Sequence, residues 1–395
     1  MTDPLGQSQV LPYLTHLSKQ GYQFTILSFE KKFRYEKEGS LIRNIASQNG
    51  ITWVPLFYTK NPPVLSKIYD RWKMKSTAIK LHKKEKFDLI HCRSYIASEM
   101  GQWLQKKTGV KFLFDMRGFW ADEKADCGQW DLKKPFYKKV YDHYKQKEKE
   151  FLLEANGIVS LTQAAKNEVL SHNEYKKVSI DVIPCCADLD HFDYRKVTAL
   201  RQQELRKQLN ISDNQKVISY VGSVGGWYMT KEMFAFFKRL INKYPEFVML
   251  LLTKDDPEMV KAEAAEHGIA ADRLKILYST RNDLPAYISL SDCSIFFIRP
   301  TYSKIASSPT KHGELMGMGV PVICNNIGDT GNIIEATKTG LVVNEFNDQE
   351  YDRIVNKMDE LLSMSKENIR AAAYQYFDLD KGAHEYLEIY QRIMN

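Results

Sequence analysis

Lys311 and Glu314 have the residue types and spacing that suit a ligand with a phosphate and a hydroxylated ring. They stand three residues apart, and side chains at that spacing share one face of a helix. Ser308 followed by Pro309 is typical of a helix N-cap and first helical residue. A helix that starts there has Lys311 in its first turn, where unpaired amides and the helix dipole favour an anion. We therefore predict a ligand site at residues 307–323.

The alternative is an exposed pair on a helix surface, which contributes roughly a few tenths of a kcal/mol. The surrounding residues favour a site. Gly317 and Gly319 predict the end of the helix, and residues 320–324 have the pattern of a buried parallel strand. Ligands of such α/β folds bind at strand ends, where loops and helix N-termini gather.

A glycine-rich stretch follows another predicted strand and offers a second part of the site. Gly222, Gly225 and Gly226 let a backbone approach a phosphate, and Lys231 adds a positive charge. A tight turn is the simpler explanation of these glycines, because a glycine-rich turn alone is weak evidence. Arg299, at the end of a further predicted strand, can add another cation.

The whole string at residues 307–323 resembles the nucleotide-sugar signature of glycosyltransferase family 4, which has the GT-B fold. Its features are small residues, Pro-Thr-Lys, a glutamate, and then Gly-x-Gly-x-Pro-Val-Ile. The resemblance implies that Glu314 binds the nucleotide ribose and that nearby basic side chains hold the diphosphate. The family's earlier glutamate is Ala306 here, and an arginine of its glycine-rich loop is Ser223. The implied nucleotide-sugar site consists of Gly222, Ser223, Gly225, Lys231, Arg299, Ser308, Thr310, Lys311 and Glu314.

Two residues of the first half are candidates for catalysis. The family often places a histidine close to the reacting sugar, and Arg117 occupies that position here, which implies a catalytic role. A structural role for Arg117, in a buried ion pair with Asp122 or Glu123, is supported equally well. His91, at the end of a predicted strand, is a second catalytic candidate, although a lone histidine there is more often structural.

Two Asp-x-Asp triplets occur, at residues 188–190 and 378–380. They fall in a linker and before the last helix, so we predict capping or turn residues rather than metal ligands. The resemblance likewise implies transfer without a metal or another cofactor. Transfer with retention passes through an oxocarbenium-like state, so the protein must stabilise the departing diphosphate and position the acceptor hydroxyl.

The chain has 395 residues, 44% hydrophobic and 27% charged, which predicts a globular protein of two domains. Short apolar runs alternate with amphipathic stretches, a pattern that predicts βαβ units and parallel sheets. The fold class is therefore α/β, and the resemblance implies GT-B, with two Rossmann-like doubly wound domains facing across a cleft. We expect strands at 24–28, 51–57, 87–93, 110–117, 157–162, 178–185, 217–224, 247–253, 273–278, 293–299, 320–324 and 340–343.

The domain bounds follow from the resemblance, because residues 182–192 look like the family's interdomain linker. We expect an acceptor-binding domain at 1–192, a nucleotide-sugar-binding domain at 193–379, and a C-terminal helix at 380–395 that crosses back to the first domain. The resemblance also implies that the first domain opens with a central strand and a glycine-containing turn, and residues 1–9 already look like that turn. We therefore expect that strand to be missing, with roughly ten more residues in a natural form, and its absence to leave an apolar slot between two strands with unpaired edges.

Basic residues concentrate at residues 60–86. Nine Lys and Arg minus two acidic residues give this segment +7, which equals the net charge of the whole chain. Leu65, Ile68 and Trp72 give its predicted helix an apolar side. A merely solvated helix and a surface for anionic lipid headgroups are equally supported. The six cysteines, most of them in apolar runs without CxxC spacing, favour a reducing cytoplasm, and no apolar stretch approaches the roughly 18 residues of a membrane span.

These observations predict an enzyme that moves a hexosyl group, with retention, from a nucleoside-diphosphate sugar to a saccharide or lipid-linked acceptor. We expect it to act in surface-polysaccharide biosynthesis, in the cytoplasm or peripherally at the inner face of the plasma membrane. A sugar-nucleotide epimerase of the same fold is one alternative, and it would convert the donor without an acceptor. A basic nucleic-acid-binding protein is the other, but the basic segment lacks the interleaved aromatic residues typical of single-strand binding, so we expect no nucleic-acid partner.

Overall fold

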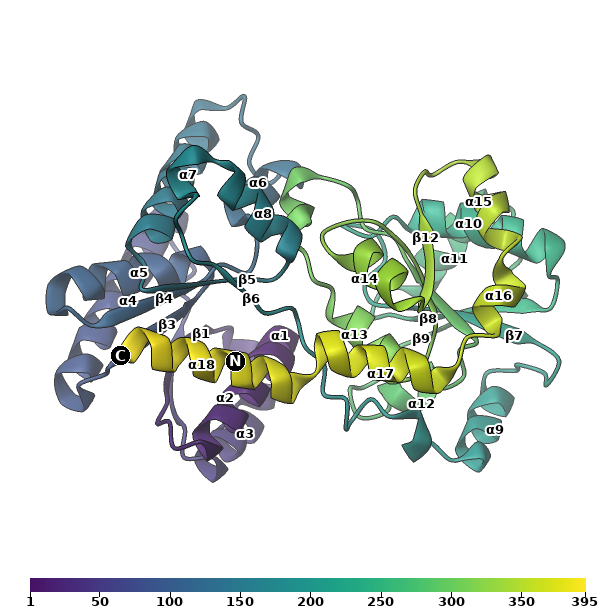
Figure 1. Cartoon of the computed structure of the whole chain (residues 1–395), viewed down its shortest axis with the longest axis horizontal. Helices are drawn as coiled ribbons and strands as arrows, with labels where there is room; N and C mark the ends of the chain where they lie inside the picture. The colour runs from purple at the N-terminus through teal and green to yellow at the C-terminus, as the bar shows by residue number, and fades with distance from the viewer.

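The computed structural model describes the backbone of residues 1–395 and every side chain except those of Pro63 and Val64. Two lobes lie side by side in Figure 1, and each is built from parallel strands flanked by helices. The predicted α/β class is confirmed. The alternation of apolar and amphipathic segments produces this architecture because each crossover helix buries its apolar stripe on the sheet beside it.

The N-terminal lobe contains two separate parallel sheets. The first pairs β1 (Thr25–Glu30) with β2 (Thr52–Phe57), and the second has the order β3-β4-β5-β6, with bounds Leu89–Arg93, Lys111–Asp115, Gly157–Ser160 and Asp181–Val182. The helices of this lobe are α1 (Pro4–Gln9), α2 (Leu11–Lys19), α3 (Lys32–Gln48), α4 (Pro63–Glu85), α5 (Ser94–Thr108), α6 (Trp120–Asp126), α7 (Pro135–Glu154) and α8 (Gln163–Ser171), with a 3-10 turn at η1 (Asn173–Tyr175).

The C-terminal lobe has one parallel sheet of six strands in the order β12-β11-β10-β7-β8-β9. In chain order the strands are β7 (Lys216–Val221), β8 (Phe247–Leu252), β9 (Leu274–Leu277), β10 (Cys293–Phe296), β11 (Val322–Asn325) and β12 (Gly340–Val343). Every residue of β8 is buried, as expected for a strand covered by helices on both faces.

Helices and short 3-10 turns connect these strands. They are η2 (Tyr194–Lys196), α9 (Ala199–Gln208), α10 (Thr230–Lys243), α11 (Pro257–Glu266), η3 (Ala271–Arg273), α12 (Leu284–Ile288), η4 (Tyr302–Ala306), α13 (Thr310–Gly317), α14 (Thr330–Thr337), α15 (Asp348–Val355), α16 (Met358–Leu362) and α17 (Lys366–Phe377).

The strand predicted at 178–185 is wrong in its length, because β6 contains only Asp181 and Val182. The apolar residues after it are buried outside the sheet: Ile183, Cys185 and Cys186 are at most 6% exposed. Their burial comes from packing of the linker under the C-terminal helix and between the lobes. An apolar run of this length does not distinguish a strand from a buried connection.

The last helix, α18 (Leu379–Met394), lies across the N-terminal lobe, where it packs on α2 (Figure 1). Tyr386 of α18 meets Tyr13 of α2 edge to face at 5.5 Å between ring centres. A Cβ on Gly382 would lie 2.7 Å from the Cys186 sulfur, so only glycine permits this approach. Asp378 is the N-cap residue of this helix and its carboxylate accepts a hydrogen bond from the Lys381 amide, while the Asp188 carboxylate accepts one from the amide of His191. The prediction of capping or turn roles for both triplets is confirmed.

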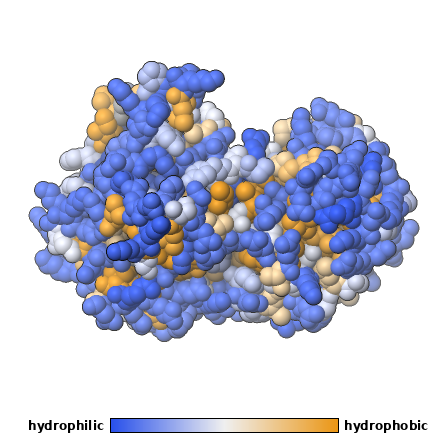
Figure 2. Space-filling model, turned by 45° about the horizontal axis from the view of Figure 1, so that its top comes forward, coloured by the Kyte–Doolittle hydropathy of each residue, from blue (hydrophilic) through white to orange (hydrophobic). Residues whose placement is uncertain are grey.

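Polar residues cover most of the face shown in Figure 2, with apolar patches on the left-hand lobe and in the waist between the lobes. Among the residues that the structure describes, no helix is long and apolar enough to cross a bilayer.

Candidate functional site

The helix α13 begins one residue later than predicted. Pro309 is its N-cap residue and makes no side-chain capping bond. The Ser308 hydroxyl instead accepts the Cys185 amide at 3.1 Å, so the prediction that Ser308 caps the helix is wrong. The hydroxyl is thus hydrogen-bonded to the linker between the lobes, and Thr310 is the first helical residue. Lys311 stays in the first turn.

Lys311 is a buried lysine without a hydrogen-bond partner among the described residues. It is 8% exposed, and its Nζ lies 3.5 Å and 4.4 Å from the ring centres of Tyr228 and Tyr220. Burial lowers its pKa to about 7, although the charge of Glu314 acts in the opposite direction. Because the side chain is buried, the alternative of an exposed surface pair is excluded. Aromatic faces stabilise an ammonium only in part, so its charged form lacks a bonded partner among the described residues.

The glycine-rich loop lies directly against Lys311. Gly222 has φ +130°, and a Cβ built on it would lie 2.6 Å from Lys311 Nζ. Any side chain at this position would therefore displace the lysine. Gly225, with φ +74°, donates its amide to the Thr230 hydroxyl at 2.8 Å, which ties the loop to the start of α10. Ser223 is exposed at the tip of the loop.

Glu314 lies one helical turn after Lys311 and is 7% exposed. Burial raises its pKa, while Arg281 and Lys311 pull it down. The Arg281 Nη1 atom lies 3.4 Å from Glu314 Oε1, and its guanidinium lies 5.4 Å from the ring centre of Phe192 in the linker. Sequence reasoning missed Arg281, although it follows β9 at the carboxyl end of the sheet, where the strand-end rule would have found it.

Lys231 and Arg299 are both exposed. Lys231 stands in the first turn of α10. The backbone of Arg299 donates to the Trp227 carbonyl at 2.9 Å, so the end of β10 borders the glycine-rich loop. Neither side chain makes an ion pair with another described residue, which leaves both cations available at the rim of the loop.

In the N-terminal lobe, the Arg117 side chain lies beside the linker and is 9% exposed. Its Nη2 lies 3.1 Å from the Cys185 sulfur and its Nη1 lies 3.8 Å from Asp115 Oδ1. The predicted pairs with Asp122 or Glu123 are wrong, because those two carboxylates bind Lys145 and Lys304. The chain turns sharply after β4, with φ +57° at Arg117, and the guanidinium lies back toward the end of its own strand.

Asp115 connects Arg117 to His91. His91 is the middle residue of β3, not its end; its Nε2 lies 3.3 Å from Asp115 Oδ2 and its Nδ1 lies 2.7 Å from the Tyr390 hydroxyl of α18. Burial raises the pKa of Asp115, but Arg117, His91 and Arg93 together hold it below its usual value. Two arginines thus share one buried carboxylate, and the Nε of each has no partner among the described residues. This cluster carries surplus positive charge.

The two lobes touch through η4. Tyr302 stacks on Phe119 at 5.1 Å between ring centres, and Lys304 Nζ lies 3.5 Å from Glu123 of α6. Lys304 is only 7% exposed and its Nζ lies 3.9 Å from the Trp227 ring centre, so it joins the glycine-rich loop to the other lobe. Sequence reasoning missed Lys304 because its partners come from distant segments.

Ala306 lies where the family signature has a glutamate. A Cβ built on Gly118 would be 3.9 Å from the Ala306 Cβ, so the turn after β4 borders the segment before α13. The Arg117-Gly118 turn of one lobe and Ala306 of the other are therefore neighbours.

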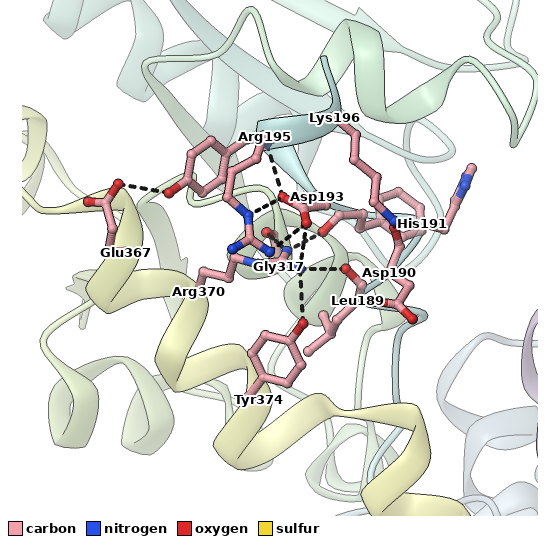
Figure 3. Close-up of polar contacts among 12 residues, drawn as sticks. Leu189, Asp190, His191, Asp193, Arg195, Lys196, Gly317, Glu367, Arg370 and Tyr374 are labelled. Atoms are coloured by element: carbon pink, nitrogen blue, oxygen red, sulfur yellow. Dashed lines mark hydrogen bonds and ion pairs between the residues drawn. The ribbon is translucent and has the colours of Figure 1, made fainter. Parts of the chain in front are cut away.

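Figure 3 shows what holds the linker against α13. The Arg370 guanidinium of α17 donates to the carbonyl oxygens of Leu189 at 2.7 Å and Phe192 at 2.6 Å, and to that of Gly317 at the end of α13. The Asp193 carboxylate lies 3.2 Å from it. One buried cation thus fixes the linker, with Phe192 under Arg281, relative to the helix that carries Lys311 and Glu314.

Comparisons with known proteins match both lobes. The family model described as Glycosyltransferase Family 4 matches residues 8–191, and that described as Glycosyl transferases group 1 matches residues 201–376. The D-inositol 3-phosphate glycosyltransferase of Gordonia bronchialis is 21% identical over 328 residues, which span 78% of this chain and 66% of that protein, just under two thirds. Spore coat protein SA of Bacillus subtilis is 23% identical over 208 residues, 48% of this chain and 52% of that protein.

Solved structures share the fold over nearly the whole chain. A glycosyltransferase from Rickettsia africae ESF-5 has a TM-score of 0.70 at 20% identity, covering 99% of this chain and 97% of that one. Anabaena HepE, solved in complex with UDP and glucose, has a TM-score of 0.70 at 15% identity and the same coverage. With one family model on each lobe and this fold throughout, the chain belongs to glycosyltransferase family 4 and has the GT-B fold.

Proposed function

We propose that the protein transfers a hexosyl group from a nucleoside-diphosphate sugar to a saccharide or lipid-linked acceptor, with retention, in surface-polysaccharide biosynthesis. The observation that carries the proposal is the unpaired, buried ammonium of Lys311 beside Gly222, one helical turn from the buried carboxylate of Glu314. A diphosphate satisfies the first group, and a ribose diol satisfies the second. HepE, a protein of the same fold, was solved with UDP-glucose, which supports a donor of this class.

The residues around Lys311 receive roles in this proposal. The diphosphate lies over Gly222, Ser223 and Gly225, against the N-terminus of α13, where Thr310 supplies a first-turn amide. Lys231 and Arg299 approach from the rim. Arg281 orients Glu314 for the ribose through their 3.4 Å contact. These groups stabilise the negative charge that builds on the leaving diphosphate as the glycosidic bond breaks.

Arg117 is proposed as the residue at the reacting sugar. Its turn borders Ala306, and its Nε has no partner among the described residues. His91 is bonded to Tyr390 and Asp115, so we assign it a positioning role, acting on Arg117 through Asp115. Because Arg93 and Arg117 leave surplus positive charge here, the acceptor proposed for this lobe presents an anionic or hydroxyl-rich face.

The proposed location is the cytoplasm, with peripheral binding to an anionic membrane. Helix α4 supports it, because Leu65, Ile68, Tyr69 and Trp72 are each 49% to 62% exposed on a helix rich in Lys and Arg. Apolar side chains flanked by cations suit a bilayer interface of anionic headgroups. Such a contact brings a lipid-linked acceptor to the N-terminal lobe.

The test is binding followed by product analysis. UDP, GDP, dTDP and ADP are titrated into the protein by calorimetry, and the sugar form of the tightest ligand is then incubated with lipid-linked and free saccharides. Glu314→Ala should weaken binding of that nucleotide by about 1.5 to 3 kcal/mol, the range for hydrogen bonds to a charged group. Unchanged affinity would refute the ribose assignment, and conversion of the donor sugar without an acceptor product would establish the epimerase alternative.

A further inference from the structure

Arg93 is a partly buried cation of the N-terminal lobe that lacks a bonded partner. It is the last residue of β3 and the ladder partner of Asp115 at the end of β4, so both side chains lie on one face at the carboxyl edge of the sheet. The Arg93 side chain makes no hydrogen bond and no ion pair with another described residue, and its Nε is shielded from solvent. A guanidinium that has lost water without gaining an anion destabilises its surroundings.

The carboxylate beside Arg93 already serves other groups. Its Oδ2 accepts the Tyr386 hydroxyl at 3.1 Å and lies 3.3 Å from His91 Nε2. The Oδ1 atom of this same Asp115 lies 3.8 Å from Arg117 Nη1. Arg93 and Arg117 therefore place two positive charges against one carboxylate. Burial, and next the charge of Arg117, lower the pKa of Arg93. The cluster thus lacks one negative charge, which a bound anion would supply.

The cluster lies at the edge of the N-terminal lobe that meets the other lobe. The turn after β4 carries Arg117 and Gly118, and a Cβ built on Gly118 would lie 3.8 Å from the carbonyl oxygen of Ala306. The 15-residue helix α5 begins at the same edge, directly after Arg93, and no side chain caps its N-terminus. Its first-turn amides and its dipole add to the positive potential of the two arginines. An anion bound here would belong to the lobe that does not carry Lys311.

We propose that Arg93 binds a phosphate group carried by the acceptor, with Arg117 and the N-terminus of α5 adding positive potential. The inference rests on the proposed function, which assigns the acceptor to this lobe and the donor diphosphate to Lys311. The planar guanidinium of arginine matches two oxygens of a phosphate. Phosphate fits the site better than a carboxylate, because its further oxygens remain for the uncapped amides of α5. A sugar phosphate and a lipid phosphate share this chemistry.

The test measures binding of phosphate-bearing probes after the donor site has been filled. The nucleoside diphosphate that binds most tightly is first titrated into the protein by calorimetry, and failure of this step alone contradicts the proposed function. The saturated protein is then titrated with glucose 6-phosphate, with dihexanoyl phosphatidic acid and with glucose. Binding of glucose 6-phosphate supports a sugar phosphate as the acceptor, and binding of phosphatidic acid alone supports a lipid phosphate.

Arg93→Gln should weaken binding of the phosphate probe by about tenfold or more, because hydrogen bonds to a charged group are lost. Its affinity for the nucleoside diphosphate should stay unchanged, which also shows that the variant is folded. Arg93→Lys keeps the charge without the planar fork and should weaken the probe less.

Arg43→Gln, at an exposed arginine of α3, is the matched control, because it removes the same charge from the same lobe. It should change the affinity for neither ligand. Saturated wild-type protein that binds neither phosphate probe, or that binds glucose as tightly as glucose 6-phosphate, would overturn the proposal. Equal losses in Arg93→Gln and Arg43→Gln would overturn it as well, because the net charge of the lobe would then account for the binding.

Discussion

At the scale of single residues, Lys311 is unusual because its buried Nζ has no hydrogen-bond partner among the described residues. Its Nζ faces two tyrosine rings and a glycine, and Glu314 is close enough to act on its pKa but not to bond it. In the proposed site, an incoming phosphate would restore to the Lys311 ammonium the stabilisation that water provides elsewhere.

Proton uptake on ligand binding tests this view of Lys311. With a pKa of about 7, about nine in ten of its side chains are neutral at pH 8, and a bound diphosphate raises that pKa by its negative charge. Binding of the preferred nucleoside diphosphate at pH 8 should therefore take up nearly one proton, measured by calorimetry in buffers of different ionisation enthalpy.

Lys311→Met should abolish this uptake and weaken the diphosphate more than the nucleoside. Lys243→Met, at an exposed lysine of α10, is the matched control and should change neither. A wild-type protein that takes up no proton at pH 8 would show that the phosphate does not lie at Lys311.

Arg117→Lys tests the proposed role at the reacting sugar. Lysine keeps the charge but loses the planar fork that reaches Cys185 and Asp115 together. We expect kcat to fall by about tenfold or more, the equivalent of at least one hydrogen bond to a charged group, with donor affinity nearly unchanged. Arg201→Lys, at an exposed arginine, is the control. If Arg117→Lys retains full turnover, the arginine is structural.

At the scale of elements, Arg370 is the link between α17, the linker and the end of α13 (Figure 3). It is 4% exposed, and its removal leaves three carbonyl groups without their donor and the buried Asp193 carboxylate with only the exposed Arg195 as a cation. Arg370→Met should lower the free energy of unfolding by about 3 to 5 kcal/mol, as for other broken buried pairs, measured by urea denaturation.

Arg195→Met is the matched control for Arg370. Arg195 binds the same carboxylate, Asp193, at 2.7 Å, but it is 62% exposed. Its loss should cost about 1 kcal/mol or less. Equal costs for the two variants would mean that burial does not decide the strength of this network.

His312 makes the stability of α13 dependent on pH. Both its ring nitrogens lack partners among the described residues, and it packs between Phe296 and Phe377. Burial lowers its pKa to about 3 from 6.5. Below pH 6.5 the unfolded chain therefore binds a proton at His312, whereas the folded chain keeps this side chain neutral until about pH 3. The free energy of unfolding therefore falls as the pH drops from 6.5 toward 3.

His312→Phe should flatten this dependence. The wild-type free energy of unfolding minus that of the variant should fall by about 1.4 kcal/mol per pH unit well below pH 6.5, measured by urea denaturation between pH 7 and pH 4.5. A difference that stays constant over that range would show that His312 is protonated equally in both states.

At the scale of the whole molecule, the exposed face of α4 is the surface proposed to meet a membrane. Several of its lysines are exposed to solvent. Replacing four exposed ones by Glu should abolish sedimentation with anionic vesicles, because each lost contact removes about 1 kcal/mol; the four are Lys67, Lys80, Lys83 and Lys84.

The control for this surface carries the same charge change on the other lobe, at four exposed lysines: Lys207, Lys243, Lys338 and Lys357. This variant should sediment as the wild type does. Wild-type protein that does not bind anionic vesicles at low salt would refute the membrane proposal. Equal loss of binding in both variants would show that the net charge of the protein, and not the face of α4, drives the binding.

The sequence by itself determined the α/β class, the strand positions of the C-terminal lobe within a few residues, and the placement of Lys311 and Glu314 on one helix. These features depend on neighbours within about one helical turn or one strand, and such short-range patterns are visible in the order of residues.

Only the tertiary structure decided which charges meet. Arg281 reaches Glu314 across 33 positions and Lys304 reaches Glu123 across the two lobes, while Asp115, rather than Asp122 or Glu123, pairs with Arg117. The structure likewise placed a cavity of about 1020 Å³ between β1 and β3, which no local pattern in the sequence shows. The packing of segments that are distant in the sequence decides which carboxylate a cation meets. Many carboxylates in the chain have similar sequence neighbours, so the sequence around a cation does not single out its partner.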